Sequence, residues 1–241
     1  MIVKFVAIKK MFQFVVSLFI FTCLVQVASF HGMLLDPVNR SSRWRFDPLA
    51  PVDYNDNEGF CGGFYNQWVI HDGKCGLCGD DYGLPAPRPH EYGGLYGNGT
   101  IVKEYAMNST LSVGVLITAN HRGYFLFDLC NMDDDHENED CFRQYQLNLT
   151  TGENRFSVKT TNRGWFNTTL ALPENVICDH CILRWTYITG NSWGKCANDT
   201  YAVGCGPQEN FRSCSDIAIL PNAVQLDNGV ENIPEDPPAE N

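Results

Sequence analysis

The chain has 241 residues, a formal net charge of −11 at pH 7 and 44% hydrophobic residues, so it is long enough and apolar enough to bury a sizeable core. The acidic balance argues against a nucleic-acid partner, because a negative surface repels phosphates. A neutral polymer would meet no such repulsion.

The N-terminal stretch has the layout of a secretory signal peptide. Three lysines precede an uncharged apolar run over residues 11–28, and no basic cluster follows it. A single membrane anchor is the alternative, although the run is near the lower length limit for spanning. We predict that residues 1–30 are removed and that the mature protein is secreted, extracellular and off the membrane. Phe30 is a poor fit to the small residue expected before the cut, so cleavage after Ser29 is the other option.

Cleavage after Phe30 would make His31 the first residue of the mature chain. Its α-amine and its ring Nδ1 could then chelate one metal ion, and the amine has a low reference pKa of roughly 7.7 to 8.0. A second imidazole would complete three nitrogens in a plane, an arrangement that suits copper(II).

Residues 48–99 are rich in Gly, Pro, Tyr and Cys and show little regular patterning. We predict a long loop insertion that is held by disulfides and by packing on the rest of the fold. Its tyrosines, such as Tyr54, Tyr65 and Tyr92, are candidates for a polymer-binding face and equally for core positions.

From Thr110 onward the sequence breaks into short runs rich in β-branched and aromatic residues, separated by Gly, Asn, Asp or Pro. In the run at 181–190, Leu183, Trp185 and Tyr187 alternate with polar residues, which is typical of a half-buried strand. These features predict an all-β fold, an immunoglobulin- or fibronectin III-like antiparallel β-sandwich with a long disulfide-stapled loop insertion. The expected strands cover residues 110–121, 123–130, 145–151, 155–161, 165–173, 181–190 and 211–220.

The C-terminal residues 220–241 contain five acidic residues, four prolines and no basic residue, which predicts a disordered tail. We therefore expect one domain over residues 31–219, after the signal peptide at 1–30.

Ten cysteines follow Cys23 of the leader, and an even number in a secreted chain predicts up to five disulfides whose pairing the sequence does not reveal. The CxxC pairs at 75–78 and 178–181 have the spacing of zinc sites, but oxidation is the stronger expectation in a secreted chain. Six N-x-Ser/Thr triplets predict a glycoprotein. They begin at Asn39, Asn98, Asn108, Asn148, Asn167 and Asn198.

His121 ends an apolar, strand-like run and is followed by another, so we expect it at a turn between two strands. His136 lies in a run of acidic residues that reads as a solvated loop. For His71, His90 and His180 ordinary polar packing is the simpler interpretation.

Three segments in this order resemble the signatures of lytic polysaccharide monooxygenases, in particular of auxiliary-activity family 15, which is chitin-binding type 4-like. They are HGMLLDPVNRSSRWR from His31, TANHRGYFLFDLC around His121 and GCGPQENFRSCSDIAI around Phe211. The resemblance implies one copper ion held by His31 and His121. It implies that Phe211 blocks an axial position of the copper and that Ala119 limits access on the other side. Gln208 or Glu209 would hydrogen-bond a bound oxygen species.

The resemblance also implies the reaction. An external electron donor reduces the copper, O₂ or hydrogen peroxide is the co-substrate, and hydroxylation at C1 or C4 breaks a β-1,4-linked polysaccharide. Chitin is the first choice of insoluble substrate and cellulose the second, and we expect a monomer. The alternatives are a non-catalytic chitin- or polysaccharide-binding module and a secreted copper-binding protein.

Overall fold

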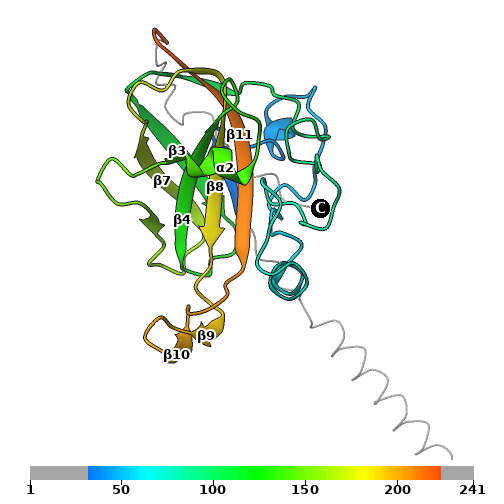
Figure 1. Ribbon diagram of the computed structural model, residues 1–241, viewed down its shortest axis with the longest axis vertical. Helices are drawn as coiled ribbons and strands as arrows, with labels where there is room; N and C mark the ends of the chain where they lie inside the picture. Colours follow the sequence, from blue (N-terminus) through cyan, green and yellow to red (C-terminus); the bar gives the residue numbers. More distant parts are fainter. Residues whose placement is uncertain (1–31, 224–241) are drawn as a thin grey trace, which may run out of the picture. The chain divides into compact units, whose positions relative to one another are not determined.

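The computed structural model describes residues 32–223, and the predicted signal peptide, His31 and most of the predicted tail lie outside this part of the chain. Two β-sheets form the body of the fold (Figure 1). The smaller sheet has the strand order β1-β3-β7, with β1 at Gly32–Asp36, β3 at Thr110–Ile117 and β7 at Gly164–Ala171.

The larger sheet has the order β2-β11-β8-β4-β5, and β6 also pairs with β4. Its strands are antiparallel except for the parallel pair of β2 and β11. Their bounds are Lys103–Ala106 (β2), Tyr124–Asn131 (β4), Tyr145–Gln146 (β5), Phe156–Ser157 (β6), Cys178–Ile188 (β8) and Asn210–Leu220 (β11).

The core lies between the two sheets, where inward-facing side chains of both form one apolar cluster. Trp185 and Tyr187 of β8 are almost completely buried, as are Val115 of β3 and Phe125 of β4. The aromatic rings contact one another edge-on or stacked, with Phe125 touching both Trp185 and Tyr187. The expected all-β sandwich is confirmed.

The outer face of β8 is also buried, which differs from the half-buried strand expected from its alternation. Arg184 and Thr186 are each only 5% exposed. Arg184 forms ion pairs with Asp128 of β4 and with Glu139 of the short helix α2, Glu139–Arg143. The alternation identified the two faces, but charged partners allow the polar face to be covered as well.

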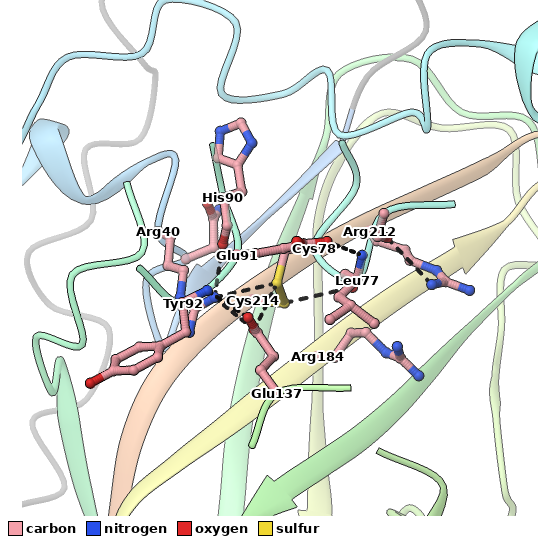
Figure 2. The surroundings of a disulfide bond; sticks show 12 residues. Arg40, Leu77, Cys78, His90, Glu91, Tyr92, Glu137, Arg184, Arg212 and Cys214 are labelled. Atoms are coloured by element: carbon pink, nitrogen blue, oxygen red, sulfur yellow. Dashed lines mark hydrogen bonds and ion pairs between the residues drawn. A yellow bond between two sulfur atoms is a disulfide. The ribbon is translucent and has the colours of Figure 1, made fainter. Parts of the chain in front are cut away.

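Residues 37–102, which we call the insertion, connect β1 to β2 and lie beside β11 (Figure 1). They contain only two short helical segments, Arg43–Arg45 (η1) and the π-helical turn Asn66–Ile70 (η2). A disulfide between Cys78 and Cys214 joins the insertion to β11. Figure 2 shows this disulfide beside Arg40 and Glu137, which form an ion pair of 2.8 Å.

All ten cysteines of the described chain are paired, so neither CxxC motif supplies thiolates for zinc. Cys75 and Cys78 bond to different partners, whereas Cys178 and Cys181 bond to each other. The five pairs are Cys61–Cys75, Cys78–Cys214, Cys130–Cys141, Cys178–Cys181 and Cys196–Cys205.

The last of these disulfides closes a two-stranded hairpin that extends beyond the ends of β8 and β11 (Figure 1). We call residues 191–206 the hairpin; its strands are Trp193–Lys195 (β9) and Tyr201–Val203 (β10). No helix within residues 32–223 is long and apolar enough to cross a membrane.

The six N-x-Ser/Thr triplets divide by exposure. Asn39 is fully buried, and its amide donates to Leu34 O at 2.6 Å and to Ser42 Oγ at 3.0 Å. A glycan on that nitrogen would break both bonds, so the folded protein cannot carry one there. The other five asparagines are exposed, at 98, 108, 148, 167 and 198.

Candidate functional site

His121 lies in the short connection between β3 and β4, and its backbone is held on both sides. Its N–H donates to the Tyr187 hydroxyl at 3.0 Å, and its carbonyl accepts from the Gly190 N–H at 3.0 Å. Gly123 closes the turn with φ of +89°, and a Cβ there would lie 2.0 Å from the Ile188 carbonyl oxygen. The turn therefore places His121 at a fixed position beside the end of β8.

The ring of His121 is half-buried, and its Nε2 atom is shielded from solvent. Burial lowers the pKa of this imidazole below its ordinary value, because the charged form is disfavoured away from water. The ring is then neutral at neutral pH, which is the form that binds a metal ion. Its Nδ1 lies 2.8 Å from the amide nitrogen of Asn191, at the start of the hairpin.

Phe211 reaches the same place from β11. Its ring is 1% exposed and stacks on Tyr187, with 5.8 Å between the ring centroids. Burial raises the pKa of Tyr187 to about 12, so its phenol remains protonated. One phenol thus separates Phe211 from the backbone of His121, and this side of the turn is apolar.

Gln208 and Glu209 occupy different environments. The Gln208 amide nitrogen donates to the carbonyls of Ser192 and Cys205, and its oxygen accepts from the Ser192 N–H. Its backbone carbonyl accepts from the indole of Trp68 in η2. Gln208 is therefore committed to holding the hairpin and η2 together.

Glu209 is half-buried, and burial raises the pKa of its carboxyl. Its backbone carbonyl accepts from the Thr189 N–H at 3.1 Å, next to the end of β8. Of the two residues left open by the sequence, Glu209 is the one whose side chain is not already used by the hairpin. Ala119 lies half-buried in the bend two residues before His121.

The start of β1 lies against the end of β3. Gly32 is paired with Ile117, and a Cβ on Gly32 would lie 2.6 Å from the Ile117 side chain and 3.2 Å from Trp185. A larger residue here would require the Ile117 side chain to shift. His31 is the next residue in the sequence but lies outside the described part of the chain.

The other described histidines are each committed to a carboxylate. His180 lies 2.7 Å from Asp216, and His90 lies between Asp53 and Asp80. His71 pairs with Asp81, and His136 with Asp135. These contacts agree with the structural roles expected from the sequence.

One group of three metal-type ligand atoms is close together within residues 32–223, at Cys78, Glu137 and Cys214. Its two sulfur atoms are joined in a disulfide and offer no thiolate (Figure 2). The neutral, partly buried imidazole of His121 beside an apolar ring fits a copper ligand far better.

The sequence did not single out Tyr187 or Asn191 as part of this site. Tyr187 was placed on the inner face of its strand, and that face carries its ring to His121. Nothing in the local sequence distinguishes Asn191, because its partner is 70 residues away along the chain.

Comparison with known proteins agrees with this geometry. The family model for "lytic polysaccharide mono-oxygenase, cellulose-degrading" matches residues 31–217. A search of curated proteins found no match.

Two solved structures are similar to the chain. A lytic polysaccharide monooxygenase of auxiliary-activity family 15 from Thermobia domestica, in the Cu(I) state, is 47% identical, with a TM-score of 0.77. The alignment covers 80% of this chain and all of that one. The cellulose-active enzyme CelS2, in complex with copper, is 15% identical over 78% of this chain and 98% of its own. Its TM-score of 0.42 is too low to support an argument.

The family match spans most of the chain, and the Thermobia domestica protein shares nearly half of the aligned residues. The resemblance found in the sequence is thereby confirmed. The chain belongs to the lytic polysaccharide monooxygenase family and is a copper-dependent monooxygenase of the family 15 type.

Proposed function

We propose that this protein is secreted and cleaves chitin, or secondarily cellulose, by hydroxylating C1 or C4, with one copper held by His31 and His121. The observation that carries this proposal is that the Tyr187 hydroxyl and the Gly190 N–H hold the backbone of His121 on the turn that follows β3. Gly32 pairs with the end of the same strand, and its neighbour in the chain is His31.

The bound copper would accept electrons from an external donor and activate O₂ or hydrogen peroxide. With O₂, hydroxylation of the C–H bond consumes two electrons and two protons and releases one water. The hydroxylated carbon then expels the glycosidic oxygen, which breaks the chain.

The residues of this chain have separate tasks in the proposal. Phe211 offers no ligand atom and would help to exclude water from a bound copper, and the small side chain of Ala119 would limit access to it. Glu209 would hydrogen-bond a bound oxygen species, and burial raises the pKa of its carboxyl above the usual value. The Gln208 side chain is bonded to the hairpin, so we assign the hydrogen bond to the oxygen species to Glu209.

A face of the hairpin supplies a surface for the polymer. Trp193 pairs with Val203, and Lys195 pairs with Tyr201, so these four side chains share one face. Trp193 is 67% exposed and Tyr201 61% exposed. Exposed aromatic rings bury apolar area against the faces of sugar rings. This face begins two residues after Asn191, which contacts His121.

The test uses secreted protein that begins at His31, compared with a form that carries one added alanine before His31 and with His121→Ala. We expect only the first form to bind copper tightly and to release oxidised oligosaccharides from chitin in the presence of a reductant. Mass spectrometry distinguishes C1 products, which are aldonic acids, from C4 products, which are ketoaldoses. Activity of His121→Ala would refute the proposed ligand set.

The same experiment separates the alternatives. Chitin binding without copper or products would identify a non-catalytic binding module. Tight copper binding without products from chitin or cellulose would identify a copper-binding protein.

A further inference from the structure

One side chain of the hairpin reaches the ring of His121. The amide of Asn191 lies 2.8 Å from Nδ1 of the imidazole, which is hydrogen-bonding distance. The two residues are 70 positions apart in the sequence. The contact joins the turn after β3 to the first residue of the hairpin. The other ring nitrogen, Nε2, is the one that is shielded from solvent.

The chemistry of this contact depends on which amide atom faces the ring. With the amide nitrogen toward Nδ1, the nitrogen donates, Nδ1 accepts, and the ring proton of a neutral imidazole is on Nε2. With the amide turned by 180°, its oxygen accepts from Nδ1–H, and Nε2 carries the lone pair that a metal needs. Within residues 32–223 the Asn191 side chain makes no other hydrogen bond, so rotating its amide by 180° breaks no second contact.

The backbone on both sides of Asn191 is fixed. The preceding residue, Gly190, donates to the His121 carbonyl at 3.0 Å. The following residue, Ser192, donates to the Gln208 side chain at 2.9 Å and accepts from the Gly204 N–H at 2.8 Å. The backbone hydrogen bonds of its two neighbours therefore hold Asn191 close to the His121 ring.

We propose that Asn191 is a positioning residue: its amide oxygen accepts from Nδ1–H of His121 and so fixes the tautomer whose Nε2 binds copper. The inference rests on the proposed function, because it assumes that His121 is a copper ligand. It adds a residue of the hairpin to the copper site and links the polymer-facing hairpin to the metal through one side chain. A copper ion on Nε2 would require the amide oxygen to face Nδ1, since the other orientation leaves a proton on Nε2.

The test measures copper(II) affinity by calorimetry and the copper spectrum by electron paramagnetic resonance, on protein that begins at His31. Asn191→Ala should weaken copper binding about 10- to 100-fold and change the nitrogen hyperfine pattern. Asn191→Asp should remain within about threefold of the wild type near pH 7.5, because a carboxylate can only accept and keeps the same tautomer. Asn198→Ala, compared with the wild type in protein made without N-glycans, is the control from the same hairpin: its side chain accepts from Thr200 and not from His121, so both readouts should stay unchanged.

Thermal unfolding of the copper-free variants checks that each is folded. Wild-type affinity and spectrum in Asn191→Ala would overturn the inference while leaving the proposed function intact. Equal losses in the Asp and Ala variants would overturn the acceptor role of the amide. A wild-type protein that does not bind copper would refute the proposed function and this inference together.

Discussion

The sandwich and the insertion are stabilised by different kinds of contact. The sandwich buries one continuous apolar cluster between its sheets. Apart from disulfide cysteines, the only buried apolar side chains of the insertion are those of Pro37 and Ala50. Its other buried residues are polar or charged: Asn39, Arg40, Ser41, Ser42, Arg43, Asp53, Asp56, Gln67, Asp80 and Glu91.

This difference explains how each region serves the site. Hydrophobic burial holds the strands that position His121 and Phe211, and it does not depend on protonation. The insertion relies on ion pairs and disulfides, which are directional and which respond to pH and to loss of one partner. The insertion should therefore fail under conditions that leave the sandwich intact.

The largest effect is expected from removing the disulfide between Cys78 and Cys214. It closes a loop with a sequence separation of 136, for which the chain-entropy model gives about 5 kcal/mol of stabilisation. The Cys178–Cys181 disulfide is equally buried but has a separation of 3, worth about 2 kcal/mol in the same model. Double alanine variants of each pair, compared by denaturant unfolding, should differ by about 3 kcal/mol. Equal losses in the free energy of unfolding would show that loop length does not determine how much the Cys78–Cys214 disulfide stabilises the fold.

The next effect concerns the buried ion pair that joins the insertion to β11. Arg40 donates to both carboxylate oxygens of Asp216, at 2.8 and 2.7 Å, and also contacts Glu137. These interactions hold the pKa of Asp216 below its usual range despite its burial. Arg40→Ala removes the guanidinium from two buried carboxylates, leaving Asp216 with His180 and Glu137 with the Tyr92 N–H, and should cost about 3 to 5 kcal/mol in urea unfolding.

Lys103→Ala provides the control for that measurement. Its ion pair with Asp36 has the same length, 2.7 Å, but its side chain is 30% exposed. Water already screens this pair, so the loss should stay under about 1 kcal/mol. A similar cost for both variants would mean that burial does not set the value of these ion pairs.

A third effect is a pH dependence confined to the insertion. Burial alone would lower the pKa of His90, but hydrogen bonds and charge from Asp53 and Asp80 raise it to about 9. Because the folded pKa lies above the unfolded value, the stabilisation is complete below pH 6.5 and is lost as the pH rises through 9. The shift corresponds to about 3 kcal/mol.

Hydrogen exchange between pH 6 and pH 9.5, corrected for the intrinsic rate, should show the insertion opening while β4 and β8 stay protected. His90→Gln should remove this pH dependence. Uniform opening of both regions would contradict the idea that they are stabilised separately.

The sequence predicted the sandwich well because its information is local and periodic. Alternation placed Trp185 and Tyr187 inward, and a run of apolar residues ended at His121, where the chain turns. The insertion was recognised as a stapled loop, yet neither the pairing of Cys78 nor the contact of Arg40 with Asp216 could be predicted. Those contacts join positions more than 100 residues apart and leave no periodic trace. The contact of Asn191 with His121 could not be predicted for the same reason, because it spans 70 residues.

The smallest effect distinguishes the two regions as surfaces for the polymer. Trp193 belongs to the hairpin that the sandwich strands carry, whereas Tyr54 of the insertion is 78% exposed. If the hairpin is the binding face, Trp193→Ala should weaken adsorption to chitin by about 1 kcal/mol, roughly fivefold. The reason is that a sugar ring of the polymer loses the indole on which it stacks. Tyr54→Ala should bind like the wild type. Copper affinity should be unchanged in both, since neither ring contacts His121. The reverse order of the two variants would move the polymer-binding face to the insertion and leave the hairpin with the sole task of holding Asn191.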